Sequence, residues 1–395
     1  MTRSHTKSST EGNDRVRVMP VWALRARAAA LLLAVAGVCW VSGSRFRSMH
    51  TGDVIYPSTG LTARKSLSDY SPGLRGTAGD TDVYIFQGER DGAGILILGG
   101  THPNEPAGFI TATLLVENTR AARGKVVVIP QANRSGFTHN DPFEGNPQRF
   151  SISTPEGLRW FRYGSRLTNP VHQWPDSALY VNPSGQRLAG TESRNLNRSY
   201  PGRRTGGGLT ERVAHAIMEL MRIEAVDMAV DLHEAAPEYP VINAIVFHPE
   251  SAELAAMTMM ELELGGLAFR LEESPSSLGG LSHREWGDHA GVFAFLLETA
   301  NASHGRLKGR PSVALITEGK DPNYVKAARL GLLFVGFDEE GIPLQKRVAR
   351  HVAALRALLA SWKELFPEKP LEVTGWPDAA AIASTGVGPF LHPPK

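Results

Sequence analysis

The sequence predicts an α/β protein: a three-layer α/β/α sandwich built on a mixed, mostly parallel sheet. From about residue 83 to residue 365, short apolar runs rich in β-forming residues alternate with helical stretches. Strands that alternate with helices favour a parallel sheet that is covered on both faces. The chain has 395 residues, of which 42% are hydrophobic and 21% charged, so it can bury a large core.

The elements of this fold are assigned from the apolar runs and the helical patterns. The expected strands are residues 83–87, 94–99, 125–130, 226–232, 242–247, 292–298 and 312–317. The expected helices are residues 106–120, 209–224, 251–265 and 341–364. The first of these helices opens with Pro106, a residue that is favoured in the first helical turn. Residues 131–208 interrupt the alternation, and long insertions inside compact domains are usually functional.

The most apolar segment of the chain lies near its N-terminus. Residues 28–44 carry no charge over 17 positions, which is the lower limit for a membrane-spanning helix and slightly more than a signal peptide needs. Because basic residues precede this segment, we expect a cytoplasmic N-terminus and an extracytoplasmic body, either anchored or released by cleavage near residues 41–43. The single cysteine, Cys39, lies in the same segment, so the body contains no disulfide.

The chain is expected to divide into five parts. They are a basic cytoplasmic N-terminus (1–27), a signal-anchor or signal-peptide segment (28–44), a linker rich in Ser, Thr, Gly and Pro (45–82), the main domain (83–366) and an irregular, proline-rich tail (367–395). The formal net charge of +2 gives no reason to expect general binding to nucleic acid.

Side chains that can bind a metal or carry a proton lie at the ends of three expected strands. His102 follows one strand, His233 ends the run "VDMAVDLH", and Glu298 ends the run "VFAFLLE". Ligands of open α/β sheets bind outside the carboxyl ends of the strands. Glu105 comes three residues after His102 at the beginning of a helix, so the two side chains can converge. With a second histidine they make a His₂Glu set that leaves the fourth position of a tetrahedral zinc for water.

A structural alternative stays open at this point. One His-x-x-Glu among 13 histidines is close to what chance supplies, and a histidine at a strand end is commonly a hydrogen-bonded structural residue. Asp231 fits either a group that orients the nearby His233 or a cap at the end of the strand. The sequence contains no Gly-x-Ser-x-Gly elbow and no phosphate-binding loop, which argues against a serine hydrolase and a nucleotide-binding enzyme.

Four motifs in a fixed order resemble those of a known family: "GGTHPNEPAG", "RNLNRSYPG", "VDLHEA" and "LLETAN". They resemble the landmarks of the succinylglutamate desuccinylase and aspartoacylase family, which belongs with the zinc carboxypeptidases in fold and metal site. The resemblance spans roughly residues 90–320. Pro103 departs from it, because that position is usually glycine in the desuccinylases.

The resemblance implies a role for each site residue. It makes His102, Glu105 and His233 the ligands of one zinc ion per chain, Glu298 the catalytic carboxylate, and Asn197 and Arg198 the pair that holds a substrate carboxylate. A rival for the catalytic carboxylate is Glu318 in "ALITEGKD", which also ends an expected strand.

An arginine of the long insertion is expected to stabilise the negative charge that develops on the carbonyl oxygen during hydrolysis. The candidates are Arg134, Arg159, Arg162 and Arg166. The order of residues in the carboxypeptidases favours Arg162 among them.

The expected function is a zinc-dependent hydrolase with residues 83–366 as its catalytic domain. It would cleave an amide bond next to a free carboxylate in a small acyl-amino acid or peptide, as a carboxypeptidase or an N-acyl amino acid deacylase does. Glu298 would take a proton from water and deliver it to the leaving amine. Two alternatives remain: a zinc esterase or amidase that uses the same site, and a non-catalytic protein that binds carboxylated peptides or cell-wall fragments. The protein is expected to associate with the membrane through its N-terminal segment.

Overall fold

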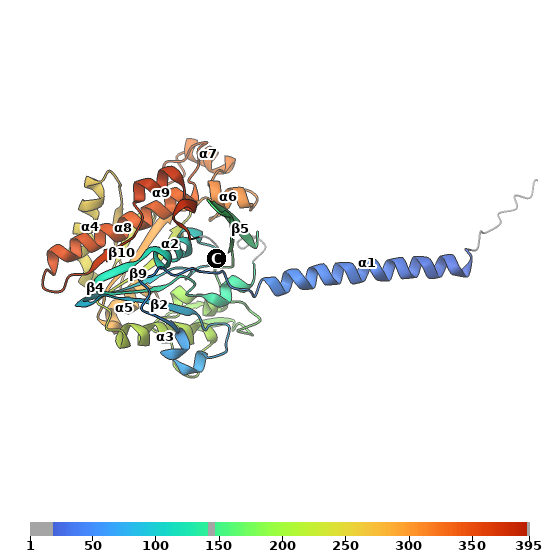
Figure 1. The fold of residues 1–395 in the computed structure, drawn as a ribbon, viewed down its shortest axis with the longest axis horizontal. Coiled ribbons are helices and arrows are strands. Elements are labelled where there is room, and N and C mark those ends of the chain that lie inside the picture. Colours follow the sequence, from blue (N-terminus) through green and yellow to red (C-terminus); the bar gives the residue numbers. More distant parts are fainter. Residues whose placement is uncertain (1–18, 141–146, 393–395) are drawn as a thin grey trace, which may run out of the picture. The chain divides into compact units, whose positions relative to one another are not determined.

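The computed structural model describes residues 19–140 and 147–392 (Figure 1). The chain forms two compact units, residues 1–50 and 51–395. The described part of the first unit is dominated by the helix α1 (Val21–Ser48), which has no buried side chain. This helix includes the apolar segment 28–44, and its length and composition suffice for a membrane span.

The second unit is built on a nine-stranded sheet in the order β1-β2-β4-β3-β9-β12-β10-β11, with β13 paired to β4. Its strands are β1 (Ala63–Ser66), β2 (Asp82–Gln87), β3 (Arg90–Leu98), β4 (Arg120–Ile129), β9 (Met228–Ala235), β10 (Ala244–Phe247), β11 (Arg270–Glu273), β12 (Phe293–Ala300) and β13 (Glu372–Thr374). The central strands β4, β3, β9 and β12 are parallel to one another, and antiparallel strands flank them on both sides. The central strands therefore all end at the same edge of a mixed sheet.

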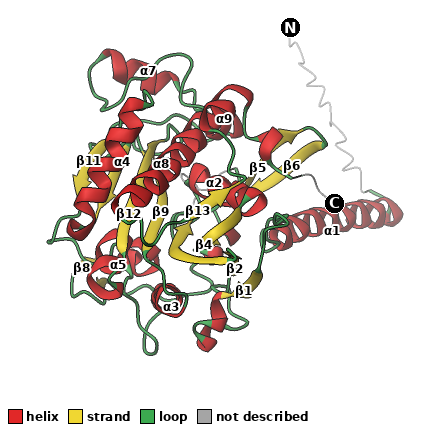
Figure 2. Ribbon diagram, turned by 60° about the vertical axis from the view of Figure 1, so that its left-hand side comes forward, coloured by secondary structure: helices red, strands yellow, loops and turns green. Residues whose placement is uncertain are grey.

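Helices cover both faces of this sheet (Figures 1 and 2). Along β3, Ile95 and Ile97 belong to one hydrophobic core, whereas Leu96 and Leu98 belong to the other. The first core is closed by α2 (Pro106–Asn118), α4 (Ala252–Leu264), α8 (Leu344–Leu365) and α9 (Ala379–Thr385), and the second by α3 (Leu209–Ile223) and α5 (Ser282–Ala290). A strand that packs on both sides must be apolar at every position, which explains its continuous apolar run. The predicted three-layer sandwich is confirmed.

The insertion 131–208 forms two small hairpins outside the main sheet. In the first, β5 (Arg149–Thr154) pairs with β6 (Gly157–Arg162), and in the second, β7 (Leu179–Val181) pairs with β8 (Arg187–Ala189). Between and after the hairpins, loops and short 3₁₀ turns lead back to α3. These loops lie near the edge at which the central strands end.

The predicted strand 312–317 is wrong, because these residues form the helix α6 (Val313–Glu318), which α7 (Pro322–Arg329) follows. The side chain of Ser312 caps α6 by accepting a hydrogen bond from the Leu315 backbone N–H. Gly319 ends the helix with a φ of 65°. A short apolar run does not reveal by its period whether it is a strand or a helix. In this segment the flanking residues, Ser312 before the run and Gly319 after it, determine that the run is a helix.

The expected linker 45–82 and the expected irregular tail 367–395 both contribute regular structure. After the end of α1, the first segment forms β1 and buries Leu67 and Leu74 in the second core. The other segment forms β13 and α9 and buries Ile382 in the first core. Their Ser, Thr, Gly and Pro content is typical of loops. A few apolar side chains nevertheless pack these segments firmly onto the body.

A buried ion pair ties the sheet to two of the helices that cover it. Glu234 of β9 accepts a hydrogen bond from Arg347 Nη1 of α8 at 2.6 Å, and both side chains are fully buried. The other carboxylate oxygen of Glu234 accepts a hydrogen bond of 2.8 Å from the Ala107 backbone N–H at the beginning of α2. Arg347 also donates to the carbonyl oxygen of Ile316 in α6. These bonds fix the end of β9 relative to α2 and α8.

We expect Arg347→Met to lower the free energy of unfolding by about 3–5 kcal/mol, because it leaves the buried carboxylate of Glu234 without its cation. Urea denaturation followed by circular dichroism measures this loss. Adding Glu234→Gln should recover part of it, since the unpaired charge disappears. Arg329→Met is the matched control, because it breaks an exposed pair with Glu339 and should hardly change the midpoint. A midpoint for Arg347→Met equal to that of the control would contradict the expectation.

Candidate metal centre

The turn between β3 and α2 positions the first two predicted ligands. The backbone N–H of Glu105 donates to the carbonyl oxygen of His102 at 3.0 Å, and α2 begins at the next residue. Gly108, in the first turn of α2, lies against the carbonyl oxygen of Leu232 in β9 so closely that a Cβ atom would collide with it. The close approach of α2 to β9 brings the beginning of this helix next to His233.

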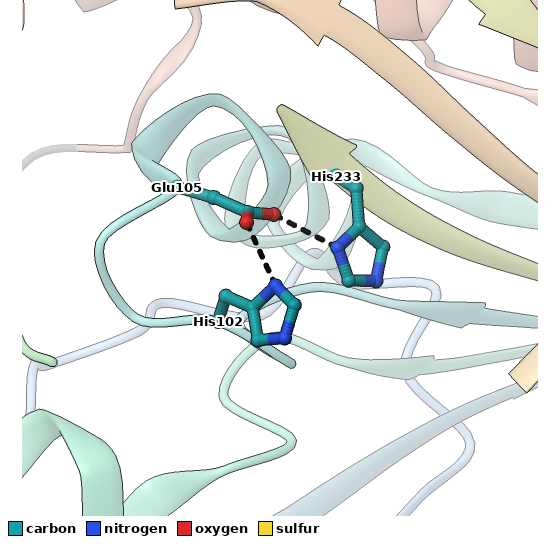
Figure 3. Close-up of side chains that lie close together, drawn as sticks. All are labelled: His102, Glu105 and His233. Carbon is teal, nitrogen blue, oxygen red and sulfur yellow. Dashed lines mark hydrogen bonds and ion pairs between the residues drawn. The ribbon is translucent and has the colours of Figure 1, made fainter. Parts of the chain in front are cut away.

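His102, Glu105 and His233 converge at one point (Figure 3). One ligand atom from each lies within 4.8 Å of the others, and all three residues are buried. Glu105 lies between the two rings, with Oε1 at 2.7 Å from His102 Nδ1 and Oε2 at 2.8 Å from His233 Nδ1. The Glu234 backbone N–H also donates to Oε2, at 3.0 Å. The three residues predicted as ligands are therefore brought together.

The far side of the His102 ring fixes its tautomer. Its Nε2 lies 2.9 Å from the side-chain oxygen of Asn195. That oxygen also accepts from the Asn197 backbone N–H, while the Asn195 amide nitrogen donates to Glu192, so the orientation of the amide is fixed. Because an amide oxygen can only accept, Nε2 must carry the proton. The lone pair on Nδ1 therefore points at the carboxylate of Glu105.

A carboxylate orients His233 in the same way. Asp231 Oδ2 lies 2.9 Å from His233 Nε2, and Asp231 Oδ1 accepts a hydrogen bond of 2.7 Å from the Thr101 hydroxyl. If His233 binds a metal through Nδ1, this carboxylate would stabilise the proton on Nε2. A carboxylate behind a histidine ligand is a common arrangement that fixes the tautomer and raises the basicity of the ligand. Of the two roles considered for Asp231, its position fits the orientation of a ligand.

The electrostatics of the site couple both histidines to Glu105. Burial, with Arg166 close by, lowers the pKa of His102 to about 4, which leaves this ring neutral. Although burial opposes it, the carboxylates of Asp231 and Glu105 raise the pKa of His233 well above its ordinary value. The carboxylate of Glu105 thus faces His233 on one side, and on the other side Arg166 Nη1 lies 3.4 Å from Oε1. Two histidines and a glutamate are the donors of many catalytic zinc sites, so the residues fit such an ion.

Glu298 lies beside this cluster because of the strand register. In the parallel pair of β12 and β9, Glu298 is directly opposite His233, so both side chains project from the same face of the sheet. Burial raises the pKa of Glu298 to about 8. Its Oε2 atom is buried and has no hydrogen-bond partner within the described ranges 19–140 and 147–392. An unpartnered carboxylate oxygen next to the predicted ligands is available for proton transfer.

Glu318, the rival carboxylate, lies elsewhere. It is the last residue of α6, and its side chain is exposed. The assignment of this glutamate to a strand end depended on the predicted strand 312–317, and that strand is a helix. Glu318 therefore has neither the position nor the burial that Glu298 has.

The structure places Arg166, and not the favoured Arg162, against the predicted ligands. Arg166 Nη1 lies 3.3 Å from His102 Nδ1 and 3.4 Å from Glu105 Oε1. Arg162 is the last residue of β6, and it is buried beside Asp53, which accepts its backbone N–H. The other two candidates bind elsewhere, Arg134 to the Asp80 carbonyl oxygen and Arg159 to Glu117. The order of residues in the carboxypeptidases favoured Arg162, and the insertion has no periodic pattern that could have indicated Arg166 instead.

The motif "RNLNR" contributes to the site in a different way from the one expected. Asn197 is buried and its side-chain oxygen accepts the Ser282 backbone N–H at 2.8 Å, so it holds the beginning of α5. Asn195, which the sequence reasoning missed, contacts His102 directly. Burial and the nearby Arg166 lower the pKa of Arg198, whereas Glu298 raises it. Arg198 is therefore close enough to Arg166 and Glu298 to interact electrostatically with both. The repeated asparagine in the motif was the only signal that could have indicated Asn195.

No protein-family model and no curated protein matches this sequence. Solved structures are similar to it. Apo cell shape determinant protein Csd4 from Helicobacter pylori is 13% identical with a TM-score of 0.44, and the match covers 77% of this chain and 59% of that one. A metallo-carboxypeptidase from Burkholderia cenocepacia is 11% identical with a TM-score of 0.44, covering 78% and 66%. A succinylglutamate desuccinylase/aspartoacylase from Rhodobacter sphaeroides is 17% identical with a TM-score of 0.37, covering 64% and 63%.

These solved structures include the family whose motifs the sequence resembles, and a metallo-carboxypeptidase as well. The match spans 59% of the length of the Helicobacter protein. The likeness is one of fold, so the chemistry of this chain has to be argued from its own side chains.

We expect the purified protein to bind about one zinc ion per chain, as a mononuclear His₂Glu site does. His233→Ala should lose this zinc, because it removes one of three ligands. Elemental analysis after dialysis measures the metal, and circular dichroism shows whether the fold is kept. His248→Ala is the matched control, since His248 is a buried histidine that contacts Asp288. Equal zinc content in the two variants would remove His233 from the site.

Proposed function

We propose that the protein is a zinc-dependent hydrolase that cleaves an amide bond next to a free carboxylate. The observation that carries this proposal is the geometry at Glu105, where each carboxylate oxygen faces an imidazole nitrogen, from His102 on one side and His233 on the other. When bound by these residues, zinc polarises a carbonyl group and lowers the pKa of water to about 7. The side chains around the site supply the proton transfer and hold the substrate.

Glu298 is the proposed general base. It is next to His233 in register, and one of its oxygens is buried without a partner among the described residues. Burial raises its pKa, while His233 and Arg166 favour its ionised form. As a carboxylate it takes a proton from the attacking water, and as the resulting acid it passes this proton to the nitrogen of the leaving amine. No other carboxylate proposed for this role lies at the site.

Two arginines are proposed to bind the substrate and to stabilise developing charge. Arg166 lies against the ligands His102 and Glu105, so its guanidinium can donate to the carbonyl oxygen as negative charge grows there. Arg198 keeps about a third of its side chain exposed, and its nearest carboxylate, on Glu192, is 4.0 Å away. Its planar fork is suited to a bidentate contact with a substrate carboxylate. This pair favours a carboxypeptidase or an N-acyl amino acid deacylase.

We also propose that the body works outside the cytoplasm with α1 as its membrane anchor. The helix is long and apolar enough to span a bilayer, and its first turns carry Arg25 and Arg27. Basic residues at this end of a span favour a cytoplasmic N-terminus.

Glu298→Gln tests the chemistry, because glutamine keeps the shape of the side chain but cannot accept a proton. We expect kcat to fall by at least about 10²-fold, with zinc content unchanged and KM within a few-fold of wild type. The measurement needs a substrate from a screen of acyl-amino acids and short peptides. Glu318→Gln is the control and should be fully active, since Glu318 is exposed on α6. If only Glu318→Gln is inactive, the base is assigned wrongly. If no substrate is turned over at all, the protein is a binding protein.

The two proposed arginines should differ in their kinetic effects. Arg198→Ala should raise KM about tenfold or more, because a substrate carboxylate loses a charge-assisted contact. The same variant should not affect a substrate whose carboxylate is amidated. Arg166→Ala should instead lower kcat by about 10²-fold or more, as the loss of an oxyanion donor does. Arg162→Lys, which keeps the charge beside Asp53, should leave both constants nearly unchanged. A larger loss of kcat in Arg162→Lys than in Arg166→Ala would restore Arg162 as the oxyanion donor.

A further inference from the structure

The hairpin of β5 and β6 has one buried and one exposed face. It lies at the periphery of the body, apart from the main sheet (Figure 2). Arg159 and Phe161 of β6 are buried, whereas the alternate residues Leu158 and Trp160 are 59% and 50% exposed. In the register of the hairpin, Leu158 pairs with Ser153, and Trp160 with Ser151, so small polar residues accompany the two apolar side chains. The exposed face is therefore an open apolar surface.

The buried face holds the hairpin to the segment with which the body begins. Arg159 makes a two-pronged ion pair with Glu117 of α2, and its Nη2 also donates to the carbonyl oxygen of Val54 at 2.8 Å. The Val54 side chain is exposed like those of Leu158 and Trp160. The three exposed apolar residues thus belong to two segments that a single buried arginine joins.

The covalent chain limits how far this surface can lie from the end of α1. Six residues, 49–54, separate Ser48 from the point at which Arg159 holds the chain. Fully extended, six residues span at most about 20 Å. Whatever the orientation of the two units, this short connection keeps the point at which Arg159 holds the chain within about 20 Å of the end of α1, and so in reach of a bilayer that α1 crosses.

The chemistry of the exposed face suits that location. The guanidinium of Arg149 lies over the ring of Trp160 at 4.8 Å from its centre, and Arg149 is itself exposed. Tryptophan is enriched at the level of the lipid headgroups, and arginine extends its charge to anionic headgroups while its stem covers apolar surface. Glu156 is exposed in the turn between the strands, and its charge favours contact of the hairpin tip with water. The hairpin should therefore contact the membrane along the side of β6.

We propose that Leu158 and Trp160, with Arg149, form a docking surface for the lipid bilayer that holds the body against the membrane in which α1 is anchored. This inference rests on the proposed anchoring and is independent of the hydrolytic chemistry.

The test uses the full-length protein in vesicles of equal parts phosphatidylcholine and phosphatidylglycerol, with bromine on the phosphatidylcholine acyl chains. Bromine quenches an environment-sensitive fluorophore only where the label enters the bilayer. One label is placed on Leu158→Cys in a Cys39→Ser chain. A second label, on the native Cys39, reports whether α1 itself is in the bilayer. The matched control is a label on Leu264→Cys, because Leu264 is 85% exposed at the end of α4.

We expect bromine to quench the labels at residues 39 and 158 but not the one at residue 264. Trp160→Ser or Arg149→Glu, added to the Leu158→Cys chain, should reduce the quenching at residue 158. A label on Ser153→Cys, which is exposed opposite Leu158 in the hairpin, should reproduce the result with Leu158 and Trp160 both intact. Quenching at residue 39 but at neither hairpin label would overturn the docking surface while the anchor stands. No quenching at residue 39 would overturn the anchor and the docking with it. Neither result bears on hydrolysis, which is measured in the same vesicles.

Discussion

The site depends on one buried carboxylate that has to be neutralised. Glu105 is almost completely buried, and each of its oxygens faces an imidazole nitrogen, with Arg166 Nη1 3.4 Å from Oε1. An isolated charge in such a place is too costly to keep unless a positive partner is present. Asn195 lies 2.9 Å from the outer nitrogen of His102 and directs its inner lone pair at Glu105, while Asp231 Oδ2 lies 2.9 Å from the outer nitrogen of His233. His233 and Arg166 supply positive charge next to Glu105, and the further positive partner that we propose is a metal ion held by His102, Glu105 and His233.

Several parts of the fold hold Glu105 in its position. Its position directly before α2 is set by the contact of Gly108 with β9, and its Oε2 is held by the backbone of Glu234. Glu234 in turn binds Arg347 of α8 and the first turn of α2. One strand, β9, thus carries the orienting aspartate, a ligand histidine and the residue that ties the covering helices to the sheet. Changes in the packing of α8 should therefore alter the geometry of the proposed metal centre.

The sequence was sufficient for the parts of the site that follow from a regular pattern. The apolar runs marked the strands that end at His102, His233 and Glu298, and parallel strands place such residues at one edge. The relative register of β12 and β9, which puts Glu298 opposite His233, depends on packing between distant segments and could not be read from either run. The helix α6 was mistaken for a strand because its run is too short to show a period.

The irregular insertion was the hardest part to predict. Arg162 and Arg166 are four residues apart, yet the first is buried in a hairpin beside Asp53 and the second lies against the ligands. That difference comes from where β6 ends, and nothing periodic in residues 131–208 indicates it. In the same region, Asn195 was overlooked because its role is to orient a ligand, and such a role has no spacing rule of its own.

The long separation between the ligands has a consequence for the order of events in biogenesis. Glu105 and Glu234, whose contact accompanies the metal centre, are 129 residues apart in the chain. The pair His102 and Glu105 alone offers a metal two donors, and the third arrives only when β9 has joined β3 in the sheet. A metal held by all three donors would therefore be taken up by a chain that has already folded. If the chain crosses the membrane unfolded, this ion would be acquired after translocation, and the metal supply of the outer compartment would decide which ion is bound.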